Sequence, residues 1–165
     1  MVGVYDLCAR VQNGFRARLG RIAVPETKLN LAVSRVLYNQ GFVSSVTRGT
    51  HLGFVSSVTR GTHLGPDESY VPTTNLNVAE RRLWLSLKYY QDSPVLRKMR
   101  CISKPSRKIN CDANQFRTLA AGQAWSIVKG VNPGEIIIVS TTRGVMEIQD
   151  AVRHGIGGNL LARAN

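Results

Sequence analysis

Residues 136–161 read IIIVSTTRGVMEIQDAVRHGIGGNLL, and they reveal more about the architecture than any other part of the chain. The four apolar residues at the start predict a buried strand. Three hydroxyl residues, an arginine and a glycine follow at 140–144, and they predict a loop without bulky apolar side chains. The stretch therefore predicts a strand, a loop, a short helix, a turn and a last apolar segment in close succession.

The helix is expected to run from Glu147 to His154. Acidic residues lie in its first turns and basic ones in its last, which is the charge order that a helix dipole favours, and Gly155 is placed to end it. The loop before it presents hydroxyls, amides and a guanidinium, groups that suit RNA phosphates and 2′-hydroxyls in a shallow minor groove. A helix-capping loop is the alternative interpretation of the same hydroxyl residues.

The chain is strongly basic, with 22 Lys and Arg against 10 Asp and Glu in 165 residues. The hydrophobic fraction of 43% is ordinary for one large or two small folded domains. Six basic residues lie within 97–108, and no acidic residue lies between Ser93 and Cys111. This one-sided run indicates an external polyanion, with nucleic acid favoured over an anionic membrane surface.

The sequence lacks the motifs that would indicate a disulfide-rich, metal-binding, membrane-spanning or enzymatic protein. Cys8, Cys101 and Cys111 are too widely spaced to predict a disulfide framework or a metal site. The chain has no apolar run of about 18 residues, so no membrane span is expected. Nucleophile-elbow, P-loop, zinc-protease and dinucleotide motifs are missing as well, so we expect neither an enzyme nor a cofactor.

The order of residues adds a resemblance. Val139–Met146 and Gly155–Gly158 closely resemble the closing signature of the eighth small-subunit ribosomal protein, a universal family that binds ribosomal RNA directly. Residues 6–14 resemble the opening helix of that family. Pro25 to Leu29 resemble the start of its second helix. The resemblance covers the chain except for about 48–80 and the link before Gly134.

A further motif lies in the basic run. Lys104, Pro105 and Ile109 match the family pattern, whereas Ser106 replaces its usual glycine and Asn110 stands where the family often has tyrosine. The tyrosine of the family commonly helps to contact RNA, so this part of the likeness is incomplete.

The resemblance implies an α+β fold of two small sequential α/β subdomains packed together. The N-terminal one, residues 1–92, is expected to hold two helices and a three-stranded sheet. The C-terminal one, residues 93–165, is expected to be mostly β with a short helix and to bind RNA.

Residue patterns locate further elements. A second helix is expected to open within 23–29, with Pro25 near its first turn, and to end at Gly41. The alternation of residues 81–90 predicts a strand that buries Leu83, Leu85, Leu87 and Tyr89. Strands are also expected at 42–47 and 95–103, and a short helix at 116–120.

Residues 41–52 recur without a change as residues 53–64. Two copies of a 12-residue unit cannot make a solenoid, so we interpret them as a recent tandem duplication. One copy would supply the strand at 42–47, and the other would lengthen a hairpin or loop inserted over about 48–80. His51 and His63 form a pair only through this copying, so they do not predict a metal site.

The expected function is that of a structural constituent of the small ribosomal subunit, which binds the central domain of its RNA and nucleates assembly for translation. The alternatives are a non-ribosomal RNA-binding regulator and a generic basic nucleic-acid-binding protein. Basic residues would neutralise phosphates, and hydroxyls would read sugars and base edges. The residues expected to bind RNA are Arg10, Asn13, Lys104, Pro105, Ser106, Arg107, Lys108, Ser140, Thr141, Thr142, Arg143, Gly144, Gly157 and Gly158.

Three features look most like a fungal mitochondrial member of the family. They are the substitutions within the family motifs, the insertion, and an N-terminus that is poor in acidic residues. The expected location is therefore the ribosome of the mitochondrial matrix, with a cytoplasmic or bacterial ribosome as the alternative. The first 21 residues fit either an amphipathic mitochondrial targeting sequence or a first structural helix. We favour a retained helix that also serves as an uncleaved targeting signal. Neighbouring ribosomal proteins are expected partners, reached through residues 48–80, and an obligate homo-oligomer is not expected.

Overall fold

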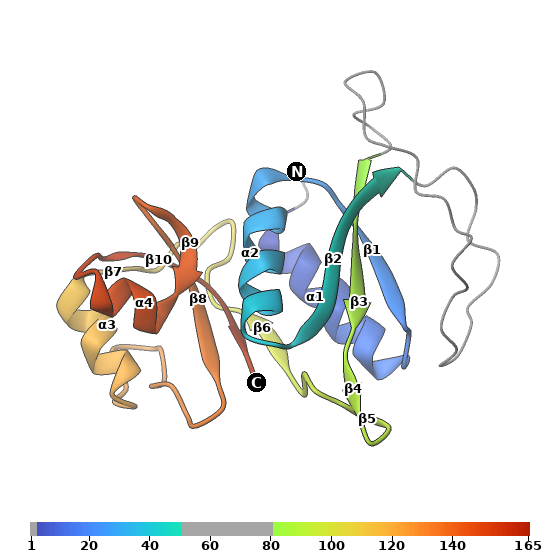
Figure 1. Ribbon diagram of the computed structural model, residues 1–165. Helices are drawn as coiled ribbons and strands as arrows, with labels where there is room; N and C mark the ends of the chain where they lie inside the picture. Colours follow the sequence, from blue (N-terminus) through green and yellow to red (C-terminus); the bar gives the residue numbers. More distant parts are fainter. Residues whose placement is uncertain (1–2, 51–80) are drawn as a thin grey trace. The chain divides into compact units, whose positions relative to one another are not determined.

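The computed structural model describes residues 3–50 and 81–165, and it confirms the α+β class (Figure 1). The elements in chain order are α1 (Val4–Arg16), β1 (Arg21–Pro25), α2 (Lys28–Asn39), β2 (Val43–Thr50), β3 (Arg81–Leu87), β4 (Tyr89–Tyr90), β5 (Ser93–Pro94), β6 (Met99–Cys101), β7 (Asn110–Cys111), α3 (Ala113–Ala120), β8 (Ile136–Thr141), β9 (Gly144–Glu147), α4 (Ile148–Arg153) and β10 (Gly158–Ala164). His51, His63, the second repeat copy and most of the expected insertion lie outside the described residues.

Contacts divide the described chain into two compact units. The first unit is Arg10–Leu96, and the second is Arg97–Asn165 together with the chain up to Ala9. Helix α1 therefore contributes its first turns to the second unit and its last turns to the first.

The first unit contains a three-stranded antiparallel sheet in the order β1-β3-β2. Leu83, Leu85 and Leu87 of the central strand are buried, which confirms the predicted alternation. Tyr89 departs from it, because β3 ends at Leu87 and Tyr89 lies half-buried in the separate short strand β4. The Tyr89 hydroxyl donates a hydrogen bond to the carbonyl of Leu19 over 2.8 Å, so this half-buried polar group is satisfied.

Helix α1 packs closely on this sheet at Gly14. A Cβ atom at Gly14 would lie 2.7 Å from Cγ2 of Ile22 on β1 and 3.0 Å from Cδ1 of Leu87 on β3. The glycine that ends the opening motif is therefore needed for close helix–sheet packing.

The second helix begins at Lys28, inside the predicted window 23–29, but the prediction that Pro25 lies near its first turn is wrong. Ala23–Pro25 belong to β1, and Thr27 caps α2 by accepting a hydrogen bond from the Asn30 amide over 3.0 Å. Pro25 is tolerated there because β1 is an edge strand and Pro25 is its last residue. The predicted end is confirmed, since Gly41 follows α2 with a φ of 78°.

The second unit is built on a sheet in the order β6-β10-β8-β9, with β7 also paired to β10. Helices α3 and α4 pack on this sheet. The buried core is Cys111, Phe116, Leu119, Val128, Ile137, Val139, Ile148, Ala151 and Leu160. The mostly β subdomain with a short helix is thus observed, together with α3.

The predicted loop at 140–144 is a β-hairpin. Strand β8 continues to Thr141, and β9 pairs back on it with Thr141 opposite Gly144. Gly144 has a φ of 114°, which a side chain would strain. The predicted helix is α4, which begins at Ile148 after Glu147 as its N-cap.

Two other boundaries differ from the prediction. Of the predicted span 95–103, only Met99–Cys101 form a strand in the sheet of the second unit. The amides of Arg97 and Lys98, just before it, donate to the Asn165 carbonyl. Helix α3 is longer than predicted and begins at Ala113, after Asp112 as its N-cap. The Asp112 amide donates to the side chain of Gln115 in the first turn over 3.0 Å, as in a capping box.

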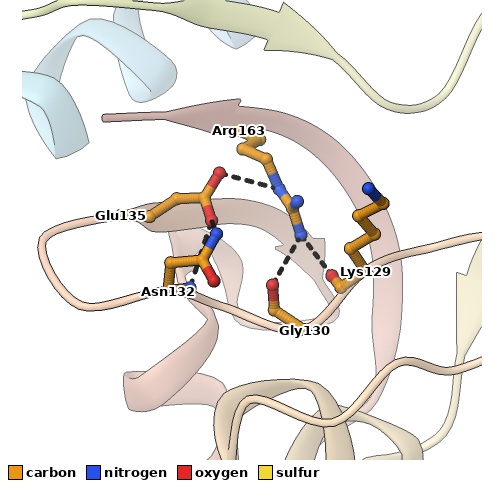
Figure 2. Close-up of polar contacts among 5 residues, drawn as sticks. All are labelled: Lys129, Gly130, Asn132, Glu135 and Arg163. Carbon is orange, nitrogen blue, oxygen red and sulfur yellow. Dashed lines mark hydrogen bonds and ion pairs between the residues drawn. The ribbon is translucent and has the colours of Figure 1, made fainter.

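A buried ion pair holds the loop before β8 against β10 (Figure 2). The guanidinium of Arg163 lies 3.1 Å from Oε1 of Glu135 and donates to the carbonyls of Lys129 and Gly130. Oε2 of Glu135 accepts hydrogen bonds from the backbone and side-chain amides of Asn132 over 3.1 and 3.2 Å. The link before Gly134 is therefore anchored to the sheet.

Within residues 3–50 and 81–165, no helix is long and apolar enough to cross a membrane. The same residues contain no group of three His, Cys, Asp or Glu side chains that could hold a metal ion.

Candidate nucleic-acid interface

The tip of the β8–β9 hairpin is shaped by one hydroxyl. Oγ1 of Thr141 donates to the Gly144 carbonyl over 2.9 Å and accepts from the Arg143 amide over 3.2 Å. These two bonds close the turn and leave Thr142, Arg143 and Gly144 exposed, whereas Ser140 is half-buried. The hydroxyl cluster is therefore a hairpin turn and not the helix-capping loop of the alternative interpretation.

Arg143 is oriented across the turn by His154, the residue that follows α4. Its Nη1 lies 3.4 Å from Nδ1 of His154. A guanidinium can only donate, so Nδ1 of His154 is the acceptor in this contact. The contact gives the exposed guanidinium a preferred position beside the hairpin.

Gly157 and Gly158 lie against backbone of their own unit. A Cβ atom at Gly158 would lie 2.3 Å from the Ser140 carbonyl oxygen, and one at Gly157 would lie 2.6 Å from the Cys111 carbonyl oxygen. These glycines therefore let the start of β10 fit between β8 and β7. Their first role in the structure is to bring the neighbouring segments together.

The basic turn after β6 is tied to the same end of the sheet. Backbone bonds between Lys104 and Arg107 close the turn in both directions, at 2.9 and 3.0 Å. Oγ of Ser103 donates to Oδ1 of Asn159 over 2.8 Å and accepts from the Ile109 amide over 3.0 Å. Side chains 104–108 are all exposed, so their charges face solvent.

The register of β10 shows which predicted residues come together. Gly158 lies opposite both Thr141 and Cys111, and Asn159 lies opposite both Ser140 and Asn110. The hairpin tip, the two glycines and the basic turn thus converge at one end of the second unit's sheet. We call this region, residues 103–110, 140–144 and 154–159, the hairpin-tip surface.

Arg10 and Asn13 are not part of the hairpin-tip surface. Both are exposed on α1 and belong to the first unit. Nη1 of Arg10 contacts the Ala23 carbonyl of the neighbouring β1 over 3.4 Å, which holds its side chain along the sheet.

Three residues that the sequence analysis did not select help to build the surface. Ser103 and Asn159 connect the basic turn to β10, and His154 orients Arg143. Asn159 carries no signal in the sequence, because its partner is 56 residues away. His154 could have been noted from its place at the end of a predicted helix, next to the hydroxyl cluster.

The hairpin-tip surface combines exposed cations with small donors and acceptors on a rigid sheet end. Cations bind phosphates, and hydroxyls and amides fit sugar hydroxyls and base edges. Comparison with known proteins agrees with this chemistry. The family model described as "Ribosomal protein S8" matches residues 3–164.

The chain belongs to the ribosomal protein S8 family. A similar protein is the small ribosomal subunit protein uS8m of Schizosaccharomyces pombe, which is 43% identical over 155 residues that span 94% of each chain. The uS8m protein of Neurospora crassa is 39% identical over 160 residues, covering 97% of this chain and 96% of that one. The uS8 protein of Neisseria meningitidis is 27% identical over 158 residues, or 96% and 92% of the two chains. Family membership confirms the resemblance drawn from the motifs.

Proposed function

We propose that this chain is a structural constituent of the small subunit of the mitochondrial ribosome. It is a non-enzymatic protein that binds ribosomal RNA in the mitochondrial matrix and acts in translation. The observation that carries this proposal is the 43% identity to a fungal mitochondrial small-subunit protein over 94% of both chains. Its basic charge of +12 fits an RNA partner.

We assign the contacts to two kinds of group. Lys104, Arg107, Lys108 and Arg143, together with Arg10, neutralise phosphates and set the orientation of the protein. Ser140, Thr141 and Thr142 read sugar hydroxyls and base edges in the minor groove of a helix of the central domain. Asn13, Pro105, Ser106, Gly144, Gly157 and Gly158 complete the set, by direct contact or by letting backbone approach the RNA.

Several finer assignments belong to the same proposal. Residues 93–165 form the RNA-binding subdomain, and residues 1–92 form the other subdomain with its insertion at 48–80. That insertion contacts neighbouring ribosomal proteins, and the chain binds as one copy and not as an obligate homo-oligomer. These assignments rest on the family resemblance and on the length of the inserted sequence.

Sedimentation of a tagged chain from mitochondrial extract tests the proposal directly. We expect the chain to migrate with the small subunit before and after a high-salt wash and to protect one ribosomal RNA helix. Migration as a free protein, or RNA lost evenly across sequences at modest salt, would leave only a generic basic binder.

A pair of hydroxyl variants tests the residue assignment. Thr142→Val removes an exposed hydroxyl that makes neither of the two bonds that close the turn, so we expect a weaker preference for the cognate helix with little loss of general RNA affinity. Thr141→Val should lower the same preference and also lose the two bonds that close the hairpin. An equal loss on all RNAs with Thr142→Val contradicts readout by this hydroxyl.

A further inference from the structure

An open groove lies between α2 and β2 of the first unit, which run side by side (Figure 1). Its volume is about 540 Å³. Positions 31, 35 and 38 of α2 are spaced by four and three residues, so they form one stripe along the helix. The side chains that line the groove are Leu31, Arg35, Tyr38, Ser45, Val46 and Arg48. One face of a helix and one strand of the sheet therefore build this groove.

Strand β2 is an edge strand, because it pairs with β3 alone among the strands that the structure describes. It spans the eight residues Val43–Thr50, and a long free edge is a template for pairing with another chain. Val46 lies opposite Leu85, which is buried, so its side chain is on the core face of the sheet. Arg48, two residues further, is on the same face. A strand added to this edge places every second side chain on that face, in the groove beside α2.

The charged side chains that line the groove are basic. Arg35 and Arg48 are both exposed, and within residues 3–50 and 81–165 Arg35 has no ion pair. Nε of Arg48 lies 3.1 Å from Oε1 of Glu26, but its side chain is still 52% exposed. A guanidinium has five N–H donors, so Arg48 can bind a second carboxylate. The groove is therefore complementary to an acidic partner.

We propose that this groove is the docking site for an extended, acidic segment of a partner protein, which adds to the outer edge of β2 as a further strand. The backbone of the segment pairs with β2, and its carboxylates bind Arg35 and Arg48. Apolar side chains between the carboxylates pack on Leu31, Val46 and the ring of Tyr38, which is 50% exposed.

The lining of the groove favours a protein over RNA. An RNA strand is held by a series of cations along its phosphates, whereas this groove has two arginines and one of them is already paired with Glu26. The Glu26 carboxylate repels phosphates that approach the same arginine. A free strand edge offers alternating N–H and C=O groups, and another strand carries the matching repeat.

A labelled peptide of sequence TETVTET tests the site on the full-length chain, by fluorescence anisotropy in the absence of RNA. In an added strand, its two glutamates and its valine share one face. We expect saturable binding, together with slower hydrogen exchange of the β2 amides. The matched peptide TKTVTKT carries lysines instead, and we expect it to bind at least about tenfold more weakly.

Variants separate the groove from the general charge of the chain. Arg35→Gln with Arg48→Gln should weaken binding of TETVTET by about tenfold or more, because each arginine loses a charge-assisted hydrogen bond. Arg35→Gln alone breaks no ion pair within the described residues and should weaken it by about threefold or more. The control Arg16→Gln with Arg18→Gln removes the same charge from exposed positions after and within the end of α1, and it should change the affinity by less than about twofold.

Four results would overturn the proposal. Equal losses with the two double variants, or equal binding of the two peptides, would mean that the peptide responds only to total charge. A labelled oligouridine strand that binds more tightly than TETVTET and depends on Arg35 would make RNA the occupant. A dimer of the chain that is lost with Arg35→Gln and Arg48→Gln would make a second copy the occupant. The peptide assay contains no RNA, so its failure is distinguishable from a failure of the proposed function.

Discussion

Gly158 lies where three strands meet, and its missing side chain is a requirement of that packing. A Cβ atom there would lie 2.3 Å from the Ser140 carbonyl oxygen and 3.1 Å from the Thr141 Cα, which are both backbone atoms that cannot rotate away. We expect Gly158→Ala to lower the free energy of unfolding by about 2–3 kcal/mol, in the range of overpacked sites. Urea unfolding of the free chain measures this loss. Gly20→Ala is the control, because a Cβ atom at that position would meet no other atom within 4 Å. This change should alter the free energy of unfolding by less than about 0.5 kcal/mol.

The ion pair between Glu135 and Arg163 is expected to contribute far more than an exposed one. Their side chains are 8% and 18% exposed, and each has further hydrogen bonds in the loop before β8. A double-mutant cycle with alanine should give a coupling of about 1–3 kcal/mol, because either single change leaves a largely buried charge without its partner. The exposed pair Asp150 and Arg153 is the matched control, with an expected coupling below about 0.5 kcal/mol. Equal couplings for the two pairs would contradict the role assigned to burial.

Glu147 should make stability depend on pH. Burial raises the pKa of its carboxyl above the ordinary 4.5, and Asp150 adds to this effect. A raised pKa favours the protonated form in the fold, so its stabilising contribution is present below the unfolded pKa and is lost as pH rises through the folded pKa. We therefore expect Glu147→Gln to gain stability relative to the parent chain between about pH 4 and about pH 7. Unfolding curves at several pH values measure the difference, and a constant difference would contradict the assignment.

At the scale of elements, long alternating or periodic segments were predictable and short ones were not. The leucines of β3 and the end of α2 at Gly41 followed directly from their patterns. Strand β9 has only the four residues Gly144–Glu147, which are too few to show a period, so the sequence predicts no strand there. The site shows the same limit: its residue types were evident, but the pairing of Asn159 with Ser140 depends on a register between distant strands.

Strand β2 bears on the duplicated unit. Its residues Val43–Thr50 pair with the whole of β3, from Leu87 to Arg81, so one copy completes this edge of the sheet. Deletion of residues 53–64 leaves the first copy intact, and we expect the free energy of unfolding to change by less than about 0.5 kcal/mol. Hydrogen exchange of β2 and β3 amides should also stay unchanged. A large loss of stability would mean that the second copy contributes to the folded core.

At the scale of the whole molecule, the net positive charge and the local group of cations on the hairpin-tip surface have different expected effects on RNA binding. The net charge of +12 attracts any polyanion, but the exposed cations at 104–108 lie on the hairpin-tip surface beside the hydroxyls. Affinity from phosphate contacts falls with salt, with a slope of about 0.9 per contact measured for duplex DNA. The slope therefore counts the contacts that a set of cations makes.

We expect the triple variant Lys104→Gln, Arg107→Gln, Lys108→Gln to lower the salt slope of binding to the cognate ribosomal helix by about 1–3. The control Lys28→Gln, Arg35→Gln, Lys88→Gln removes the same charge from exposed positions of the first unit, and its slope should change by less than about 1. Titration of a labelled RNA helix at several salt concentrations measures both slopes. If the two variants lose the same slope, RNA responds to the total charge of the molecule and the basic turn has no special place in the contact. A loss confined to the first variant means that phosphates lie against the turn, next to the groups that read the sugar edge.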